Sequence, residues 1–320
     1  MKKALIVIGV CAGCGTGDDL GAPRLVERAS NLVPVTKLAF DADNRPLGLL
    51  DADHRRRLAR LTADGWVPIE STENYNVLDF TAADDGTVLA AVGNLSPGSG
   101  VFRFMPDDQV VQQGNRLTTT VLIDPYQSPS GDLYVSSADG GRRLSHGAQD
   151  WGIAKALAQV VHTDDAIYGL SSTGLERLVG VLADDDTTTV MLPCSALPVA
   201  CSVIHFDGRD GAGRTFFHAD DAPELWILDD GASELFPLAI PGTQALGSVL
   251  ATPRFVVVEV IVETEDRRDS VLYILPSGGD TFTLVDTRAH TALERPVLAV
   301  DHDGTVFAAH ADWLGTIELE

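Results

Sequence analysis

Apolar and polar residues alternate over short stretches along most of the chain, and turn-forming residues separate these stretches. Alternation with a period of two is typical of β-strands that bury one face. The spacing of three to four residues that marks an amphipathic helix is rare here. The pattern therefore predicts an all-β protein built from many short strands.

These strands form a repeating unit: an apolar run, an Asp-Gly type of turn, a second apolar run, a break, and a third run. Turns at equivalent places recur seven times with a mean spacing of about 43 residues, close to the period of propeller repeats with four strands. One such unit cannot bury both faces alone, so we expect the units to stack around an axis. The sequence predicts a seven-bladed β-propeller over residues 33–320, with six or eight blades as alternatives.

The final unit supplies three strands and ends at Glu320, which leaves its outer edge without a partner. Propellers commonly pair such an edge with a strand from the other end of the chain, because an open edge promotes aggregation. Alternation before the first unit is found near Pro23, so we expect Leu25–Glu27 to pair with Thr316–Leu319. The alternative is that residues 15–32 are a plain tether.

The first residues are typical of a secretory signal, because Lys2 and Lys3 precede the apolar run Ala4–Val10 and then small residues. This run is too short to span a bilayer, which takes about 20 apolar residues. A buried N-terminal strand or an uncleaved anchor helix is the alternative. We interpret the segment as an export signal.

Ala12-Gly13-Cys14 resembles the lipobox of bacterial lipoproteins, although Cys11 occupies a position where that pattern usually has Leu. The resemblance implies removal of residues 1–13 as a signal peptide and attachment of lipid to Cys14. Residues 14–32 would then be a lipidated tether that also contributes the closing strand. With Gly15 after the cysteine, we expect the periplasmic face of the outer membrane or the cell surface.

Two cysteines remain after these assignments, and the six residues between them include Pro198, which favours a turn. The periplasm is oxidising, so the sequence predicts a disulfide between Cys194 and Cys201. Two free thiols are the alternative.

The formal charge of −23 becomes −25 when Lys2 and Lys3 are removed with the signal. A field of this sign repels nucleic acid and anionic lipid, so we expect no nucleic-acid partner and contact with a membrane only through lipid. We expect a monomer. The hydrophobic content of 45% is enough for a substantial core.

Oxygen ligands for calcium occur in Asp-rich turns, of which Asp184-Asp185-Asp186 is the best candidate. Asp also favours turns for structural reasons, so we expect no cofactor and keep calcium as an alternative. Three histidines from separate units would bind a metal if they converged on the axis: His162, His205 and His302.

The segment from Asp139 to Ile153 interrupts the repeat, and we interpret it as a long surface loop. Arginine, histidine and tryptophan are enriched where partners bind, and this segment holds Arg142, Arg143, His146 and Trp151. A loosely packed insertion is the alternative interpretation.

The repeats are similar to those of NHL-like and sensor-type periplasmic propellers, without the Trp-Asp signature of WD40 repeats or the Gly-Gly pattern of kelch repeats. This similarity implies a shape and no function. We therefore expect a membrane-tethered, non-catalytic module that binds a protein or glycan. The alternative is a metal-assisted hydrolase or lactonase with its site in the central channel.

Overall fold

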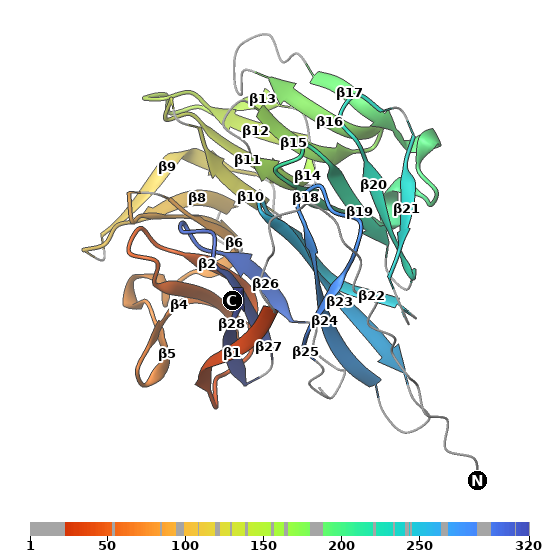
Figure 1. Cartoon of the computed structure of the whole chain (residues 1–320). Helices are drawn as coiled ribbons and strands as arrows, with labels where there is room; N and C mark the ends of the chain where they lie inside the picture. Colours follow the sequence, from red (N-terminus) through yellow and green to blue (C-terminus); the bar gives the residue numbers. More distant parts are fainter. Residues whose placement is uncertain are drawn as a thin grey trace.

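The computed structural model describes residues 23–319 except 53–54, 84, 94–98, 108, 119–121, 129, 138–139, 155–156, 163–165, 180–187, 220–221, 233, 241–242, 244, 264–267, 287–295 and 311. Seven antiparallel sheets of four strands are arranged around a central axis (Figure 1). This confirms the predicted seven-bladed β-propeller. Within the described residues, no helix is long and apolar enough to cross a membrane.

The chain builds blades 1 to 6 from the axis outward, whereas the outer strand of blade 7 precedes blade 1 in the sequence. Blades 1 to 3 contain β2 (Val35–Phe40), β3 (Pro46–Ala52), β4 (Arg55–Thr62) and β5 (Gly65–Pro68); β6 (Asn76–Ala82), β7 (Val88–Gly93), β8 (Ser99–Phe104) and β9 (Val110–Leu117); and β10 (Leu122–Gln127), β11 (Leu133–Ser137), β12 (Gly140–Leu144) and β13 (Gly152–Ala154). Blades 4 and 5 contain β14 (Ala158–His162), β15 (Ala166–Ser171), β16 (Gly174–Val179) and β17 (Thr188–Pro193); and β18 (Ile204–Arg209), β19 (Thr215–Ala219), β20 (Glu224–Leu228) and β21 (Phe236–Ala239). Blade 6 contains β22 (Ala245–Ala251), β23 (Phe255–Glu263), β24 (Arg268–Pro276) and β25 (Thr283–Asp286), and blade 7 contains β26 (Val297–Val300), β27 (Val306–His310), β28 (Trp313–Leu319) and β1 (Pro23–Ser30).

The first strand of every blade contacts the first strand of the next, from β2 around to β26 and back to β2. Figure 1 shows these strands nearest the centre of the ring. All of them begin at one face of the ring, which we call the entry face, and all end at the opposite face, which we call the turn face. Side chains at the starts of the inner strands are thereby brought together, although they are far apart in sequence.

The ring is closed by β1, which pairs antiparallel with β28 and becomes the outer strand of blade 7. Leu25 pairs with Ile317, so the predicted pairing of Leu25–Glu27 with the last strand is confirmed. Figure 1 shows the red strand β1 beside the blue strands β27 and β28. Closure removes the open edge that the last three strands would otherwise expose.

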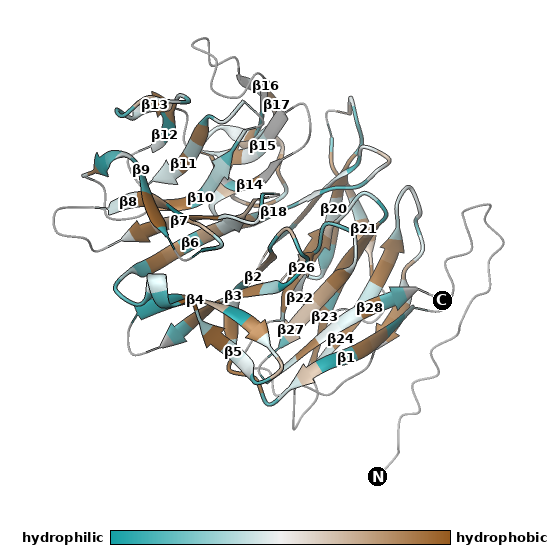
Figure 2. Cartoon of the chain, turned by 90° about the vertical axis from the view of Figure 1, so that its left-hand side faces the viewer, coloured by the Kyte–Doolittle hydropathy of each residue, from teal (hydrophilic) through white to brown (hydrophobic). Residues whose placement is uncertain are grey.

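The core lies between neighbouring blades, where the apolar faces of two sheets meet. Leu47 and Leu58 of blade 1, for example, pack with Phe80, Val88 and Phe102 of blade 2, and all are almost fully buried. Figure 2 shows hydrophobic residues concentrated along the strands and hydrophilic residues in many of the connections. Each blade therefore depends on both neighbours to cover its faces.

The Asp-rich turns of the turn face use their carboxylates to hold the backbone. Oδ1 of the buried Asp210 accepts hydrogen bonds from the amides of Ala212 and Arg214, two and four residues later, and Oδ2 accepts one from Arg214 Nε at 2.8 Å. Asp41 and Asp301 make the same bonds to the amides two and four residues on. These aspartates have a structural role in the turns.

The segment that interrupts the repeat is part of blade 3. Its interpretation as a long surface loop is wrong for β12 and β13, whereas residues 145–151 form the connection between these strands. Arg142 and Arg143 lie in β12, which pairs with β11 on one side and with β13 on the other. The pattern was hidden because β12 begins with Gly140 and Gly141 and continues with charged residues, and backbone pairing in the ring outweighs this weak strand propensity.

The disulfide between Cys194 and Cys201 is present, as predicted. It links two short 3₁₀ turns, Cys194–Ala196 and Cys201–Val203, in the connection from blade 4 to blade 5.

We expect β1 to contribute on the order of 3 kcal/mol to the free energy of unfolding, because it covers the edge of β28 and packs Leu25 and Ala29 against core clusters. A chain that starts at Leu32 should therefore unfold at a lower urea concentration than one that starts at Pro23. Equal midpoints for the two truncated chains would contradict this role for β1.

Candidate functional site

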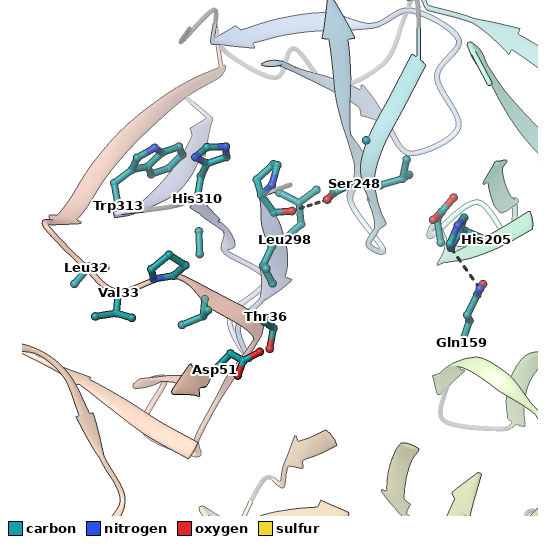
Figure 3. Close-up of a pocket in the computed structure, with 18 of the residues that line it drawn as sticks. Leu32, Val33, Thr36, Asp51, Gln159, His205, Ser248, Leu298, His310 and Trp313 are labelled. Atoms are coloured by element: carbon teal, nitrogen blue, oxygen red, sulfur yellow. Dashed lines mark hydrogen bonds between the residues drawn. The ribbon is translucent and has the colours of Figure 1, made fainter. Parts of the chain in front are cut away.

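A cavity of about 830 Å³ opens at the entry face, where the inner strands begin (Figure 3). Its lining comes from blades 1, 4, 5, 6 and 7 and from the connection that leads from β1 to β2. This volume lies within the range of sites that bind small molecules.

One side of the cavity is apolar. The connection between β1 and β2 contributes Leu32, Val33 and Pro34, and its course is held by a 2.7 Å hydrogen bond from the Leu32 amide to the carbonyl of Asp312. We call residues 31–34 the strap, because they run from the outer edge of blade 7 to the inner strand of blade 1. The closing strand of the ring thus leads directly into a wall of the cavity.

Two tryptophans extend this apolar wall. Trp66 comes from the outer strand β5 and lies across β3, where Gly48 makes room: a Cβ at Gly48 would lie 3.0 Å from the Trp66 ring and 2.7 Å from Val35. Trp313 comes from β28 and stacks on His310, with ring centroids 6.1 Å apart. Figure 3 shows Trp313 and His310 side by side on the same side of the cavity as Leu32 and Val33.

The opposite side is polar and is formed by blades 4 to 6. The side-chain amide of Gln159 in β14 contacts two residues of β18. Its Oε1 accepts a hydrogen bond from the backbone amide of Phe206, and its Nε2 lies 3.4 Å from Nδ1 of His205. Ser248 from β22 donates its hydroxyl to the carbonyl of Pro296. Figure 3 shows Gln159 and His205 at one side of the cavity and Ser248 nearer the centre.

Asp207 and His218 form a buried pair in blade 5. Nδ1 of His218 lies 2.8 Å from both carboxylate oxygens of Asp207, and the His218 ring stacks on His205 at a centroid distance of 4.6 Å. Burial raises the pKa of the Asp207 carboxyl, while the hydrogen bond and charge of His218 and the charge of His205 oppose that rise. An aspartate on Nδ1 fixes the imidazole ring, so proton exchange with a ligand would use Nε2 of His218.

Bonds between the inner strands connect consecutive blades around the axis. Asp79 of β6 accepts a hydrogen bond from Lys37 of β2 at 2.6 Å and another from the backbone amide of Asp124 in β10 at 2.6 Å. The Asp124 carboxyl in turn accepts from the backbone amide of Gln159 in β14. Together with the bond from Gln159 to Phe206, this relay joins blades 1 to 5.

The relay depends on irregular backbone in the inner strands. Asp124 and Gln159 have positive φ angles of 50° and 53°, and the pairing register shifts at both places. A left-handed conformation is unfavourable for residues with a Cβ, by about 1 kcal/mol each. The hydrogen bonds between blades compensate for this strain, and the bulges direct polar groups toward the axis.

Burial raises the pKa of Asp124 to about 6, and the nearby charge of Asp79 and their hydrogen bond add to this rise. The charge of Lys37 and the Gln159 amide oppose it. Compared with the unfolded chain, the folded protein therefore favours the neutral form of this carboxyl.

The structure does not bring His205 and His302, two of the three predicted histidines, together. His205 is the second residue of β18 and lines the cavity at the entry face. His302 lies in the turn after β26 at the turn face, where its amide donates to Asn44 Oδ1. The two faces are separated by the length of an inner strand, about 15 Å. His162 is the last residue of β14, and its side chain lies outside the described residues.

The other predicted site residues are placed apart from the cavity. Arg142 and Arg143 are consecutive in β12, so their side chains point to opposite faces of the sheet. His146 is exposed, and its amide donates to Asp132 Oδ1. Trp151 is partly buried and packs against the core cluster between blades 2 and 3.

The Asp184–Asp186 tripeptide lies outside the described residues, as does Cys14. Within the described part of the chain, no three His, Cys, Asp or Glu side chains are grouped to hold a metal ion.

Sequence reasoning singled out His205 as a candidate, and it placed Asp51 and Asp207 in Asp-rich turns rather than in a cavity. It missed other polar and aromatic residues of the lining, among them Trp66, Gln159, His218, Ser248, His310 and Trp313. A signal was available, because polar residues recur about once per blade within the inner strands of blades 1 to 5. Lys37, Asp79, Asp124, Gln159 and Asp207 are the members of this series.

No protein-family model matches the chain, and no curated protein matches it in sequence. Solved structures do. Virginiamycin B lyase from Staphylococcus aureus matches with a TM-score of 0.65 and 12% identity over 93% of this chain and 100% of that one. A streptogramin B lyase matches with a TM-score of 0.61 and 10% identity over 93% and 97%. YCF48 from Cyanidioschyzon merolae matches with a TM-score of 0.61 and 12% identity over 93% and 99%. At these identities the likeness establishes the β-propeller fold alone.

Replacing Asp124 by Asn tests the raised pKa. The folded state binds more protons than the unfolded state between pH 4 and 6, so the contribution of Asp124 to stability falls as the pH rises through this window. Asn mimics the neutral form, so Asp124→Asn should be more stable than the native protein at pH 8, by about 2 kcal/mol, and equally stable near pH 4.

Urea unfolding at pH 4 to 8 measures this difference. Asp64→Asn, at an exposed position between β4 and β5, is the control that removes the same charge. An Asp124→Asn protein that is less stable than the native one at pH 8 would show that the ionised form is the favoured one.

Proposed function

We propose that this protein is an extracytoplasmic binding module, tethered to a membrane by lipid on Cys14, that takes a small, partly apolar molecule into the cavity at the entry face. The observation that carries the proposal is the division of the cavity. An apolar wall from the strap, Trp66 and Trp313 faces a polar wall that includes Gln159 and His205. Binding sites for small organic molecules commonly combine apolar walls with a few fixed polar groups.

Export is supported by the disulfide, because such bonds persist in oxidising compartments. Rigidity supports a binding role. The relay between inner strands holds the polar wall in place before any ligand arrives, which lowers the entropic cost of binding. The sequence alone predicts a protein or glycan that binds surface loops. We infer instead that the ligand is a small molecule that enters the cavity.

A larger side chain at an exposed position of the cavity lining should weaken ligand binding. Val33 is 56% exposed and lines the cavity, so Val33→Trp should fold normally and weaken the binding of 4-phenylbutan-1-ol at least tenfold, measured by calorimetry. Val67 is 47% exposed but does not line it, and Val67→Trp is the matched control. Binding of 4-phenylbutan-1-ol by Val33→Trp at native strength would contradict the proposal.

A second candidate function is hydrolysis by acid–base chemistry, which the buried Asp207–His218 pair favours. In this reaction the imidazole of His218 takes a proton from water, and the oxygen of that water bonds to the carbonyl carbon of a lactone. The ring C–O bond then breaks, and the leaving oxygen receives the proton from the imidazolium. Asp207 keeps the ring oriented and stabilises its charged form.

Dihydrocoumarin, an aromatic lactone, is the probe for this candidate. We expect Asp207→Asn to lower the rate of ring opening about 100-fold, because the imidazole loses the partner of its Nδ1, while the control Asp64→Asn leaves the rate unchanged. Thermal unfolding of each variant shows whether the fold is kept. If the native protein opens the lactone no faster than buffer does, this candidate is excluded.

A further inference from the structure

The carboxylates of Asp51 and Asp207 line the cavity at the entry face, together with the imidazoles of three histidines, His205, His218 and His310. Among the described residues that line it, none is Lys or Arg. Lys37 lies farther along its inner strand, and its ammonium group is bound to Asp79 at 2.6 Å. The whole chain carries a formal charge of −23. A cleft with walls of low polarity focuses such a field, so the cavity has a negative potential.

We infer that the ligand of this cavity is an organic cation with an apolar body, such as an alkyl or aryl ammonium compound. This inference rests on the proposed binding function and adds the class of ligand. An anion would lose its hydration on entry without meeting a fixed positive group, which is costly. A cation would exchange its hydration for the carboxylate of Asp51 and for the faces of aromatic rings.

Asp51 is placed to meet the ammonium group. It is exposed at the end of β3 and lines the cavity, and Figure 3 shows it beside Thr36, across from the polar wall. Arg56 is its neighbour on β4, and the Arg56 guanidinium donates to the carbonyl of Leu78. Asp51 therefore adds its charge at the edge of the cavity, while Arg56 is directed toward blade 2.

The apolar wall suits the body of such a ligand. Trp66 and Trp313 line the cavity, and aromatic faces attract ammonium groups by about 0.5–2 kcal/mol depending on exposure. Leu32 and Val33 of the strap offer purely apolar surface nearby. The cavity therefore matches both parts of an organic cation, with the charged end near Asp51 and the body against the strap and the tryptophans.

Three probes with one carbon skeleton test the inference: 4-phenylbutylamine, 4-phenylbutan-1-ol and 4-phenylbutanoate. At pH 8 the amine is cationic and the butanoate is anionic. We expect the amine to bind at least tenfold more tightly than the butanoate at low salt, with the alcohol between them. The ratio should fall as salt is added.

Asp51→Asn should reduce the ratio of amine to butanoate affinity about threefold, whereas Asp64→Asn removes the same charge in blade 1 away from the cavity and should leave the ratio unchanged. Asp51 is exposed, so both variants should fold. If the alcohol binds and the amine binds no more tightly than the butanoate, the inference is overturned while the binding function stands. If none of the three probes binds, both the proposed function and the inference about its ligand are contradicted.

Discussion

The constraint on which this structure depends is that every blade has two apolar faces and must therefore have two neighbours. Phe80 and Val88 are buried only because blade 1 lies against blade 2, and Phe255 and Ile274 are buried only because blade 7 lies against blade 6. A linear stack of seven such sheets would expose an apolar face at each end, so the stack bends into a ring. The closing strand β1 then joins the two ends of the chain, because blade 7 takes three strands from the C-terminal part and one from the N-terminal part.

This closure has a consequence for the candidate site. The chain must travel from the outer edge of blade 7 to the inner strand of blade 1, and the strap is the segment that makes this passage. Trp313, which pairs with Ser30 of β1, lines the same cavity as Leu32 and Val33. The apolar wall is thus formed by the part of the fold where the ring is sealed, whereas the polar wall belongs to blades 4 to 6, where the chain is continuous.

The sequence was sufficient for features that depend on local pattern. Alternating residues and regular turns predicted seven blades, leftover alternation at Leu25–Glu27 predicted the closing strand, and a short loop predicted the disulfide. The sequence was insufficient where contacts with other strands determine the local structure. Gly140 and Gly141 resemble a loop until β11 and β13 pair with them, and Gln159 looks unremarkable until a positive φ turns it toward the backbone of Phe206. Residues that meet at the axis are separated by whole blades, so their spacing carries no direct sign of contact.

The turns and the inner strands of the ring use similar side chains in opposite ways. On the turn face, Asp41, Asp210 and Asp301 give their oxygens to the amides of their own turns, which makes the turns rigid and leaves those oxygens engaged with the backbone. Within the inner strands, Asp79 and Gln159 bond to the backbone of the next blade, so the same kind of interaction aligns separate blades around the axis. Hydrogen bonds within a turn stabilise one blade, but bonds between inner strands fix the positions of several blades at once. A cavity at the entry face therefore has walls whose relative positions are set by the fold itself, and this favours recognition there over the turn face.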